Sequence, residues 1–331
     1  MNYPESQLIL EEIKKANKIL LNCHRSPDSD SIGSALAMRQ VLIDLDKEVE
    51  IVCPSPELPK NLDYLNGYEA IKTGIDFAKF DYSKFDLFLT LDSSNWAQVT
   101  NIKNFEIPKI NTITIDHHIS NPKYGQLNLL DGEITSVGEL LFWVFSDWKV
   151  EISKDIADCL MSAIVGDTGA FRYPGVGSRT LQVASELMKI GADKDKAIHV
   201  LYRSEPYQLI KFYGEVLSRV QIDKEYGFVW SAVPYDVYEK LDKPSMAKES
   251  AASLFTQVVE GTDFGFVALE QEKNILSISF RSRNGLDTSK IALELGGGGH
   301  IYASGCRIEG PFDEAVEKVL TACRKYANKN N

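Results

Sequence analysis

The first 120 residues alternate between short apolar runs and a stretch with helical spacing. Residues 19–23, 49–53, 87–91 (LFLTL) and 112–115 (TITI) are apolar or β-branched, as strands are. Between the first two runs, residues 32–42 repeat apolar side chains at the spacing of a helix. Strands that alternate with helices form a parallel sheet with helices on both faces. The pattern therefore predicts an α/β fold for this half of the chain.

The rest of the chain continues as helices and then returns to strands. Helices are expected at 135–146, 153–165 and 180–190, and strands at 227–233, 265–269 and 276–281. A chain of this length favours about two domains. We predict a parallel-sheet domain over residues 1–193, a helical connector over 194–220 and a smaller α/β domain over 221–331.

Charge, cysteine content and hydropathy exclude several classes of protein. The net charge of −11 makes duplex DNA a poor partner, because Lys and Arg contacts to phosphate dominate its binding. The five cysteines are scattered without a CxxC pair, which favours reduced thiols. No run approaches the roughly 18 apolar residues of a membrane span, and the N-terminus lacks the features of a signal peptide. We expect a cytoplasmic protein that binds neither membranes nor duplex DNA.

Residues 23–34, CHRSPDSDSIGS, place one histidine and two aspartates directly after the first predicted strand. In an extended chain, residues two apart point the same way, so Asp28 and Asp30 could present their carboxylates together. An ordinary turn, with Asp30 or Ser31 capping a helix that begins at Ile32, explains the same residues. This stretch alone leaves both interpretations open.

Further Asp and His residues follow the later predicted strands. Asp92 follows LFLTL directly, and Asp116, His117 and His118 follow TITI. Asp167 comes after an apolar helical stretch. The carboxyl ends of parallel strands face one crevice, where converging carboxylates repel one another unless a cation neutralises them. Helix caps and a core histidine would explain each residue separately, but their joint placement favours two metal ions that share one carboxylate.

In the same order, HRSPDSD, Asp92, the DHH triplet at 116–118 and Asp167 resemble the four motifs of the DHH phosphoesterases. The distal RSR at 281–283 and GGGGH at 296–300 resemble the C-terminal domain associated with that family. The subgroup of bacterial nanoRNase/pAp phosphatases is similar in length and in domain order. The resemblance covers nearly the whole chain and implies a catalytic first domain and a substrate-binding last domain.

The resemblance also implies a set of metal ligands. One ion would take His24, Asp28 and Asp92, and the second would take Asp30, Asp92, His117 and Asp167, so that Asp92 bridges them. His118 would face the substrate phosphate, and Asp116 would orient a histidine from behind. Oxygen-rich ligation with one imidazole per ion suits Mn²⁺ better than zinc. We therefore expect two Mn²⁺ per chain.

The C-terminal motifs predict anion binding. Successive glycines let backbone N–H groups approach a phosphate closely, although LGGGGH is neither GxGxxG nor a P-loop. Arg281 and Arg283 lie two apart at the end of a predicted strand that begins near Leu276, so both guanidiniums could clamp one anion. A flexible loop and two solvated charges would explain the same residues. The acidic chain and the family resemblance favour substrate binding by Arg281, Arg283, Gly297, Gly298, Gly299 and His300.

The expected function is Mn-dependent hydrolysis of short oligoribonucleotides (nanoRNA), 3′-phosphoadenosine 5′-phosphate (pAp) or both. Rival activities are a linear dinucleotide (pApA-type) hydrolase, an exopolyphosphatase and an inorganic pyrophosphatase, the last disfavoured because GGGGH belongs with the nucleotide-acting branch. A nucleotide sensor without turnover is the rival from another class, but every motif position is filled here. The expected partners are short RNA or small phosphorylated nucleotides, with a second copy of the chain as a further candidate.

Overall fold

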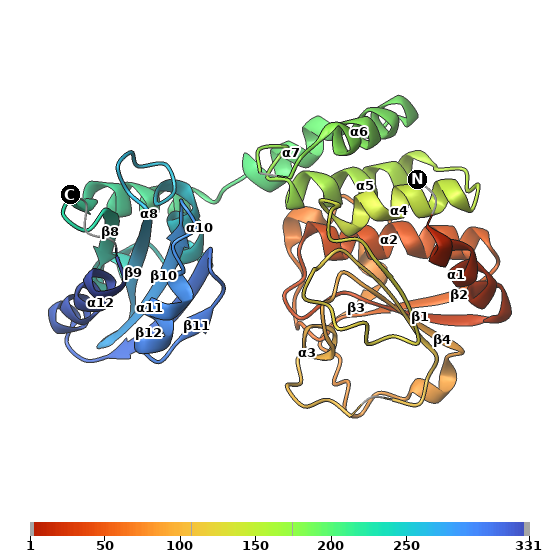
Figure 1. Cartoon of the computed structure of the whole chain (residues 1–331), viewed down its shortest axis with the longest axis horizontal. Coiled ribbons are helices and arrows are strands. Elements are labelled where there is room, and N and C mark those ends of the chain that lie inside the picture. Colours follow the sequence, from red (N-terminus) through yellow and green to blue (C-terminus); the bar gives the residue numbers. More distant parts are fainter. Residues whose placement is uncertain (1–2, 107, 174, 328–331) are drawn as a thin grey trace. The chain divides into compact units, whose positions relative to one another are not determined.

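The computed structural model describes residues 3–106, 108–173 and 175–327. The chain divides into two compact units, and the division falls after Ser204 (Figure 1). Each unit is built on its own six-stranded sheet with helices packed against it, which confirms the predicted α/β class. None of the helices within the described ranges has both the length and the apolar character needed to cross a membrane.

The first unit contains a parallel sheet with the strand order β3-β2-β1-β4-β5-β6. Its strands are β1 (Lys18–Asn22), β2 (Glu48–Val52), β3 (Ile71–Lys72), β4 (Leu87–Leu91), β5 (Thr112–Asp116) and β6 (Leu127–Leu130). The strand predictions for this unit are confirmed as β1, β2, β4 and β5, to within one residue at each end. Strand order reverses between β1 and β4, and ligands of open α/β sheets bind at the carboxyl ends beside such a reversal.

The two faces of this sheet are covered differently. The helices of the unit are α1 (Pro4–Lys15), α2 (Ser29–Asp44), α3 (Trp96–Thr100), α4 (Val137–Asp147), α5 (Lys154–Asp167), α6 (Ser178–Ile190) and α7 (Lys194–Tyr202). Helices α1, α2, α4 and α5 share one hydrophobic core with the sheet. On the other face, Phe88 and its neighbours pack under short α3 and irregular chain that carries Phe77, Phe85 and Ile110. The 3-10 turns η1 (Lys60–Leu62), η2 (Tyr68–Ala70) and η3 (Tyr82–Lys84) lie between β2 and β4 in the sequence, and Leu62 and Tyr68 pack with the core on the helical side.

Helices α2, α4 and α5 lie on the same side of the sheet and approach one another closely through glycines (Figure 1). A Cβ added to Gly33 of α2 would lie 2.5 Å from the carbonyl oxygen of Cys159 in α5. A Cβ added to Gly138 of α4 would lie 2.4 Å from the Cβ of Ala163 in α5. Real side chains do not tolerate such contacts, so hydrogen at these positions sets the spacing of the three helices. The close spacing brings the first turn of α2 beside the last turn of α5.

The second unit contains a mixed sheet with the order β11-β12-β10-β9-β8-β7, in which only the β8–β9 pair is parallel. Its strands are β7 (Gln221–Asp223), β8 (Phe228–Val233), β9 (Phe264–Glu272), β10 (Ile275–Ser282), β11 (Gly298–Gly299) and β12 (Ala303–Glu309). Its helices are α8 (Tyr207–Ser218), α9 (Tyr235–Lys240), α10 (Ala247–Phe255), α11 (Thr288–Glu294) and α12 (Phe312–Tyr326). Helices α8, α9 and α10 pack on one face and α11 and α12 on the other.

Candidate active site

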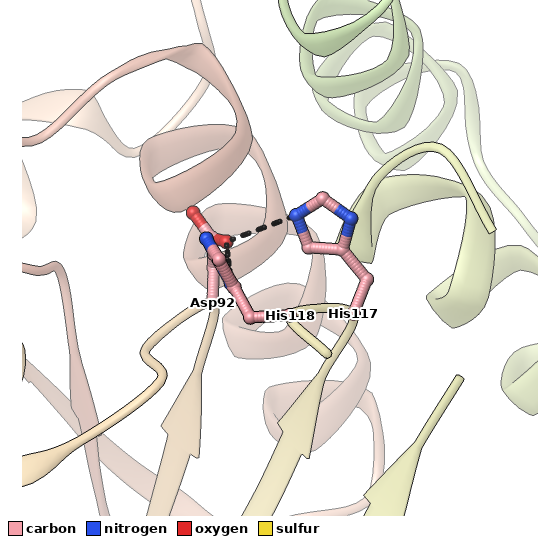
Figure 2. A group of neighbouring side chains, drawn as sticks. All are labelled: Asp92, His117 and His118. Atoms are coloured by element: carbon pink, nitrogen blue, oxygen red, sulfur yellow. Dashed lines mark ion pairs between the residues drawn. The ribbon is translucent and has the colours of Figure 1, made fainter. Parts of the chain in front are cut away.

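The ends of three neighbouring strands bring His24, Asp92 and His117 together. Asp92 Oδ2 lies 3.4 Å from His24 Nε2, and Asp92 Oδ1 lies 3.6 Å from His117 Nε2. Figure 2 shows the Asp92 carboxylate with an oxygen directed at His117 and His118. Asp92 has a left-handed backbone (φ +48°), a conformation that Asp tolerates better than most residues. A single buried carboxylate thus presents its two oxygens to two different imidazoles.

The first group of donor atoms combines His24, Asp28 and Asp92, whose donors all lie within 4.8 Å of one another. Asp28 is the N-cap of α2, and its Oδ1 accepts the N–H groups of Asp30 and Ser31. Its Oδ2 lies 3.5 Å from His24 Nε2. The helix therefore begins earlier than Ile32, and the cap is Asp28 instead of Asp30 or Ser31. Asp28 caps the helix with one oxygen and faces His24 with the other.

The second group of donor atoms combines Asp30, His117 and Asp167. Asp30 is fully buried in the first turn of α2, and its carboxylate accepts the N–H groups of Val137 (2.7 Å) and Gly138 (2.8 Å). The helical turn separates Asp30 from Asp28, so the expectation that they share one face of an extended chain is wrong. His117 Nε2 lies 4.0 Å from Asp30 Oδ2 and 3.4 Å from Asp167 Oδ2.

Asp167 is the last residue of α5, where the helix dipole disfavours a negative charge. His117 Nδ1 lies 3.4 Å from the carbonyl oxygen of Ile134. A proton shared with that carbonyl leaves Nε2 as the nitrogen that faces the carboxylates. The geometry thus supplies a group in which both carboxylates and the imidazole present lone pairs to one point.

A third set, Asp92, His117 and His118, also has donor atoms within 4.8 Å of one another. However, His118 Nδ1 lies only 2.7 Å from Asp116 Oδ1, and this hydrogen bond occupies the nitrogen nearest Asp92. Asn121 donates to the other oxygen of Asp116 at 2.7 Å. This set is therefore no independent cation site, and His118 has Nε2 left for other partners. Asn121 was not among the predicted site residues. Its position three residues after the DHH triplet could have marked it as a partner of Asp116.

The electrostatics of the site require a positive charge. Burial, followed by the charge of Asp30, raises the pKa of Asp92 and of Asp167 well above its usual range. Burial also raises the pKa of Asp30. Burial lowers the pKa of His24, but hydrogen bonds to Asp28 and Asp92 outweigh it and bring that pKa to about 10. Carboxylates held this close are stabilised by protons or by a cation, and their oxygen-rich donor set fits hard divalent ions.

The predicted arginines of the second unit are anchored on different segments. Arg281, on β10, donates from Nε to Ser253 Oγ of α10 at 3.1 Å. Arg283 follows the end of β10 and donates from Nη1 to the carbonyl oxygens of Val259 and Thr262, both at 3.2 Å. Both side chains therefore help to hold the fold around β10, in addition to any role toward a ligand.

The glycine-rich segment is an edge strand paired with β12, not a free loop. A Cβ on Gly297 would lie 2.1 Å from the carbonyl oxygen of Gly305, and one on Gly299 would also collide with β12. Close strand packing thus accounts for these two glycines. A Cβ on Gly298 would meet nothing within 4 Å, and the side chain of His300 is exposed. Gly296, where an added Cβ would also meet nothing within 4 Å, faces open space as Gly298 and His300 do.

Known proteins are similar to this chain over nearly its full length. The model of the DHH family, N-terminal domain, matches residues 18–164, and that of the DHHA1 domain matches residues 243–329. The bifunctional oligoribonuclease and PAP phosphatase NrnA of Thermus thermophilus is 29% identical over 98% of this chain and 95% of its own. The protein of the same name from Bacillus subtilis is 25% identical over 96% and 98%. The crystal structure of an exopolyphosphatase-related protein from Bacteroides fragilis has a TM-score of 0.88 at 26% identity, over 97% of this chain and 96% of that one.

The DHH match covers all six strands of the first sheet, the DHHA1 match covers β9 to β12 of the second, and together they enclose most of the predicted site residues. The DHH match contains both strand-end histidine motifs, and the DHHA1 match contains β10, the glycine-rich strand and His300. The chain therefore carries a DHH domain followed by a DHHA1 domain and is a hydrolase, similar to the phosphoesterases of the DHH family.

Proposed function

We propose that the protein hydrolyses short oligoribonucleotides and pAp with the help of two divalent cations, Mn²⁺ by preference. The observation that carries the proposal is the Asp92 carboxylate, which offers one oxygen to each of two donor groups. The substrate class is supported by the names of the relatives from T. thermophilus and B. subtilis, both bifunctional oligoribonucleases and PAP phosphatases. The same donor set would suit a polyphosphate, so that substrate belongs in the test.

The residues fit two ions that share a ligand. His24, Asp28 and Asp92 would hold one ion, and Asp30, Asp92, His117 and Asp167 would hold the other. Carboxylate oxygens with one imidazole per site suit Mn²⁺, whereas zinc favours Cys and His. Bound divalent ions would lower the pKa of water and neutralise charge on the phosphate. The protein's own contribution is to fix the distance between the two sites through one rigid, buried side chain.

His118 is the candidate for direct contact with the substrate phosphate. Its hydrogen bond to Asp116 raises the pKa of His118, which favours the protonated ring. Asp116 is held in turn by Asn121, so the ring orientation is defined. A protonated His118 can donate from Nε2 to a phosphate oxygen or to the leaving oxygen. In this role Asp116 orients the imidazole and stabilises its charge.

We expect the activity to fall steeply as RNA becomes longer than a few nucleotides. The chain carries a net charge of −11, and only a small cationic set in the second unit is available to hold phosphates. The measurement is specific activity with Mn²⁺ on pAp, pApA, RNA of 2 to 24 nucleotides and polyphosphate, at equal concentrations of ends. Equal rates on a 24-mer and a dimer would contradict the proposed substrate class. Binding of all substrates without turnover would point to a sensor instead.

His300→Ala should weaken nucleotide turnover while both ions stay bound. His300 is exposed in the second unit, and the candidate metal ligands lie in the first. Loss of one hydrogen bond to a charged group should cost about 1.5–3 kcal/mol of transition-state stabilisation. The cost is measured as a lower kcat/KM for pAp. Hydrolysis of bis-p-nitrophenyl phosphate, which has no nucleotide end, should change little. His199→Ala is the matched control, because His199 is another exposed histidine, on α7. An equal loss on both substrates would instead put His300 in the chemical step.

A further inference from the structure

We propose that Glu139 and Arg179 are positioning residues for the second donor group, Asp30, His117 and Asp167. Neither residue belongs to that group. The inference rests on the proposed function and concerns the stretch at residues 131–139, called here the 131–139 segment. This segment runs from the end of β6 into the first turn of α4.

One side of the 131–139 segment supports the donor group through its backbone. The N–H groups of Val137 and Gly138 donate to the two oxygens of Asp30, at 2.7 and 2.8 Å. The carbonyl oxygen of Ile134 lies 3.4 Å from His117 Nδ1. Two of the three members of the group therefore take their orientation from this backbone, and a shift of the segment would move both.

The other side of the segment is fastened by the fully buried carboxylate of Glu139. Glu139 Oε2 accepts from Thr135 Oγ at 2.5 Å and lies 3.3 Å from the N–H of Thr135. The same oxygen accepts from Thr180 Oγ, in the first turn of α6, at 3.0 Å. The N–H of Glu139 donates to the side chain of the helix cap, Ser136, at 3.1 Å. One carboxylate thus ties the turn before α4 to the start of α6.

Arg179 supplies the charge that a buried carboxylate needs, and it reaches the segment at further points. Its Nε lies 3.4 Å from Glu139 Oε1. Its Nη2 donates to the carbonyl oxygen of Glu133 at 2.8 Å, and its Nη1 lies 3.9 Å from Asp131 Oδ2. Because a buried carboxylate without a partner is costly, the contact with Arg179 offsets part of the cost of burying Glu139.

The first donor group takes its support from other residues. The N–H of His24 donates to Ser31 Oγ at 3.0 Å, and Asp28 is fixed as the cap of α2. The two groups are therefore held by different residues, although Asp92 belongs to the first group and also lies 3.6 Å from His117 of the second. A positioning role for Glu139 predicts damage to one ion site and not to the other. A general loss of stability would not make that distinction.

The test is Mn²⁺ affinity of the full chain, measured by titration calorimetry in two backgrounds. Asp28→Asn weakens the first donor group, so the second site should bind Mn²⁺ more tightly in that background. Asp167→Asn weakens the second donor group, so the first site should bind Mn²⁺ more tightly there. Glu139→Leu removes the acceptor oxygens at similar size and should weaken Mn²⁺ binding about tenfold or more in the Asp28→Asn background. In the Asp167→Asn background the change should stay within about twofold. Glu139→Gln keeps an acceptor oxygen and should recover most of the lost affinity.

Two further variants test the same positioning role. Thr135→Val deletes only the hydroxyl that donates to Glu139 and should reproduce the selective loss if Glu139→Leu does not fold. Glu186→Gln, which breaks a surface ion pair of α6 with Lys189, should leave both affinities unchanged. Equal losses in the two backgrounds, or no loss in either, would overturn the positioning role alone. If the protein without any substitution bound no Mn²⁺, the proposed function would be overturned as well.

Discussion

Asp92→Asn should nearly abolish turnover and, at the same time, raise the melting temperature of the metal-free protein. The loss follows from geometry, since the two oxygens of Asp92 face the two donor groups separately. Removing a residue that hydrogen-bonds to a metal ligand already lowers metal affinity or activity about 10–100-fold. Losing a ligand to both ions should therefore lower activity at least about a thousandfold. The gain in stability follows from burial and from the charge of Asp30, which raise the pKa of Asp92 and so destabilise its carboxylate.

Activity assays, Mn²⁺ stoichiometry and thermal melts with chelator check the three parts of this expectation. Asn is the informative replacement because it keeps the shape of Asp and tolerates the left-handed backbone at this position (φ +48°). Asp28→Asn and Asp167→Asn serve as controls, because each of these residues belongs to a single group. The bridging role fails if Asp92→Asn costs no more activity than either control.

Gly33→Ala should destabilise the first unit by about 2–3 kcal/mol, because overpacking of a tight helix contact costs about that much. The added Cβ would lie 2.5 Å from a backbone oxygen of α5, which cannot rotate away. Helices α2 and α5 must then separate, and they carry Asp30 and Asp167 respectively. We therefore expect weaker Mn²⁺ binding at the second donor group along with the lower stability.

Gly214→Ala makes the same change in another helix and should have the opposite sign. Gly214 lies inside α8, and a Cβ there would meet nothing within 4 Å. Alanine should then stabilise the second unit by about 0.5–1 kcal/mol, because it restricts the unfolded chain. Urea unfolding followed by tryptophan fluorescence separates the units, since Trp230 is the only one of the four tryptophans beyond Ser204. Similar effects of the two substitutions would refute the close-packing explanation.

Local patterns were enough to predict the central strands and the longest helices of the first unit. LFLTL is β4 from its first residue to its last, because a short run that is buried on both faces has a clear apolar signature. The helix predicted at 180–190 ends before Gly191, which takes the left-handed conformation of a C-cap. Strands β3 and β11 have two residues each, which is too short for an alternating pattern, so no local signal marked them.

The candidate site was predictable in its residues but less so in its geometry. The sequence placed Asp and His residues at strand ends, and the fold brings His24, Asp92 and His117 together there. It could not reveal that Asp28 caps α2, since a helix that starts three residues earlier turns Asp30 to another partner. The link between Glu139 and Arg179 crosses 40 positions of sequence, and no spacing rule connects them. The assignment of each ligand to an ion stays a prediction until metal is measured.

The placement of every candidate metal ligand in the first unit has a consequence for biosynthesis. The ligands lie between residues 24 and 167, and α6, which carries Arg179, is complete at Ile190. Domains fold as units from the N-terminus as they emerge, at about 5–20 residues per second, so roughly 6–25 s pass while the ribosome makes the second unit. The nascent chain can therefore present this donor set to the cellular pool of cations before the second unit exists.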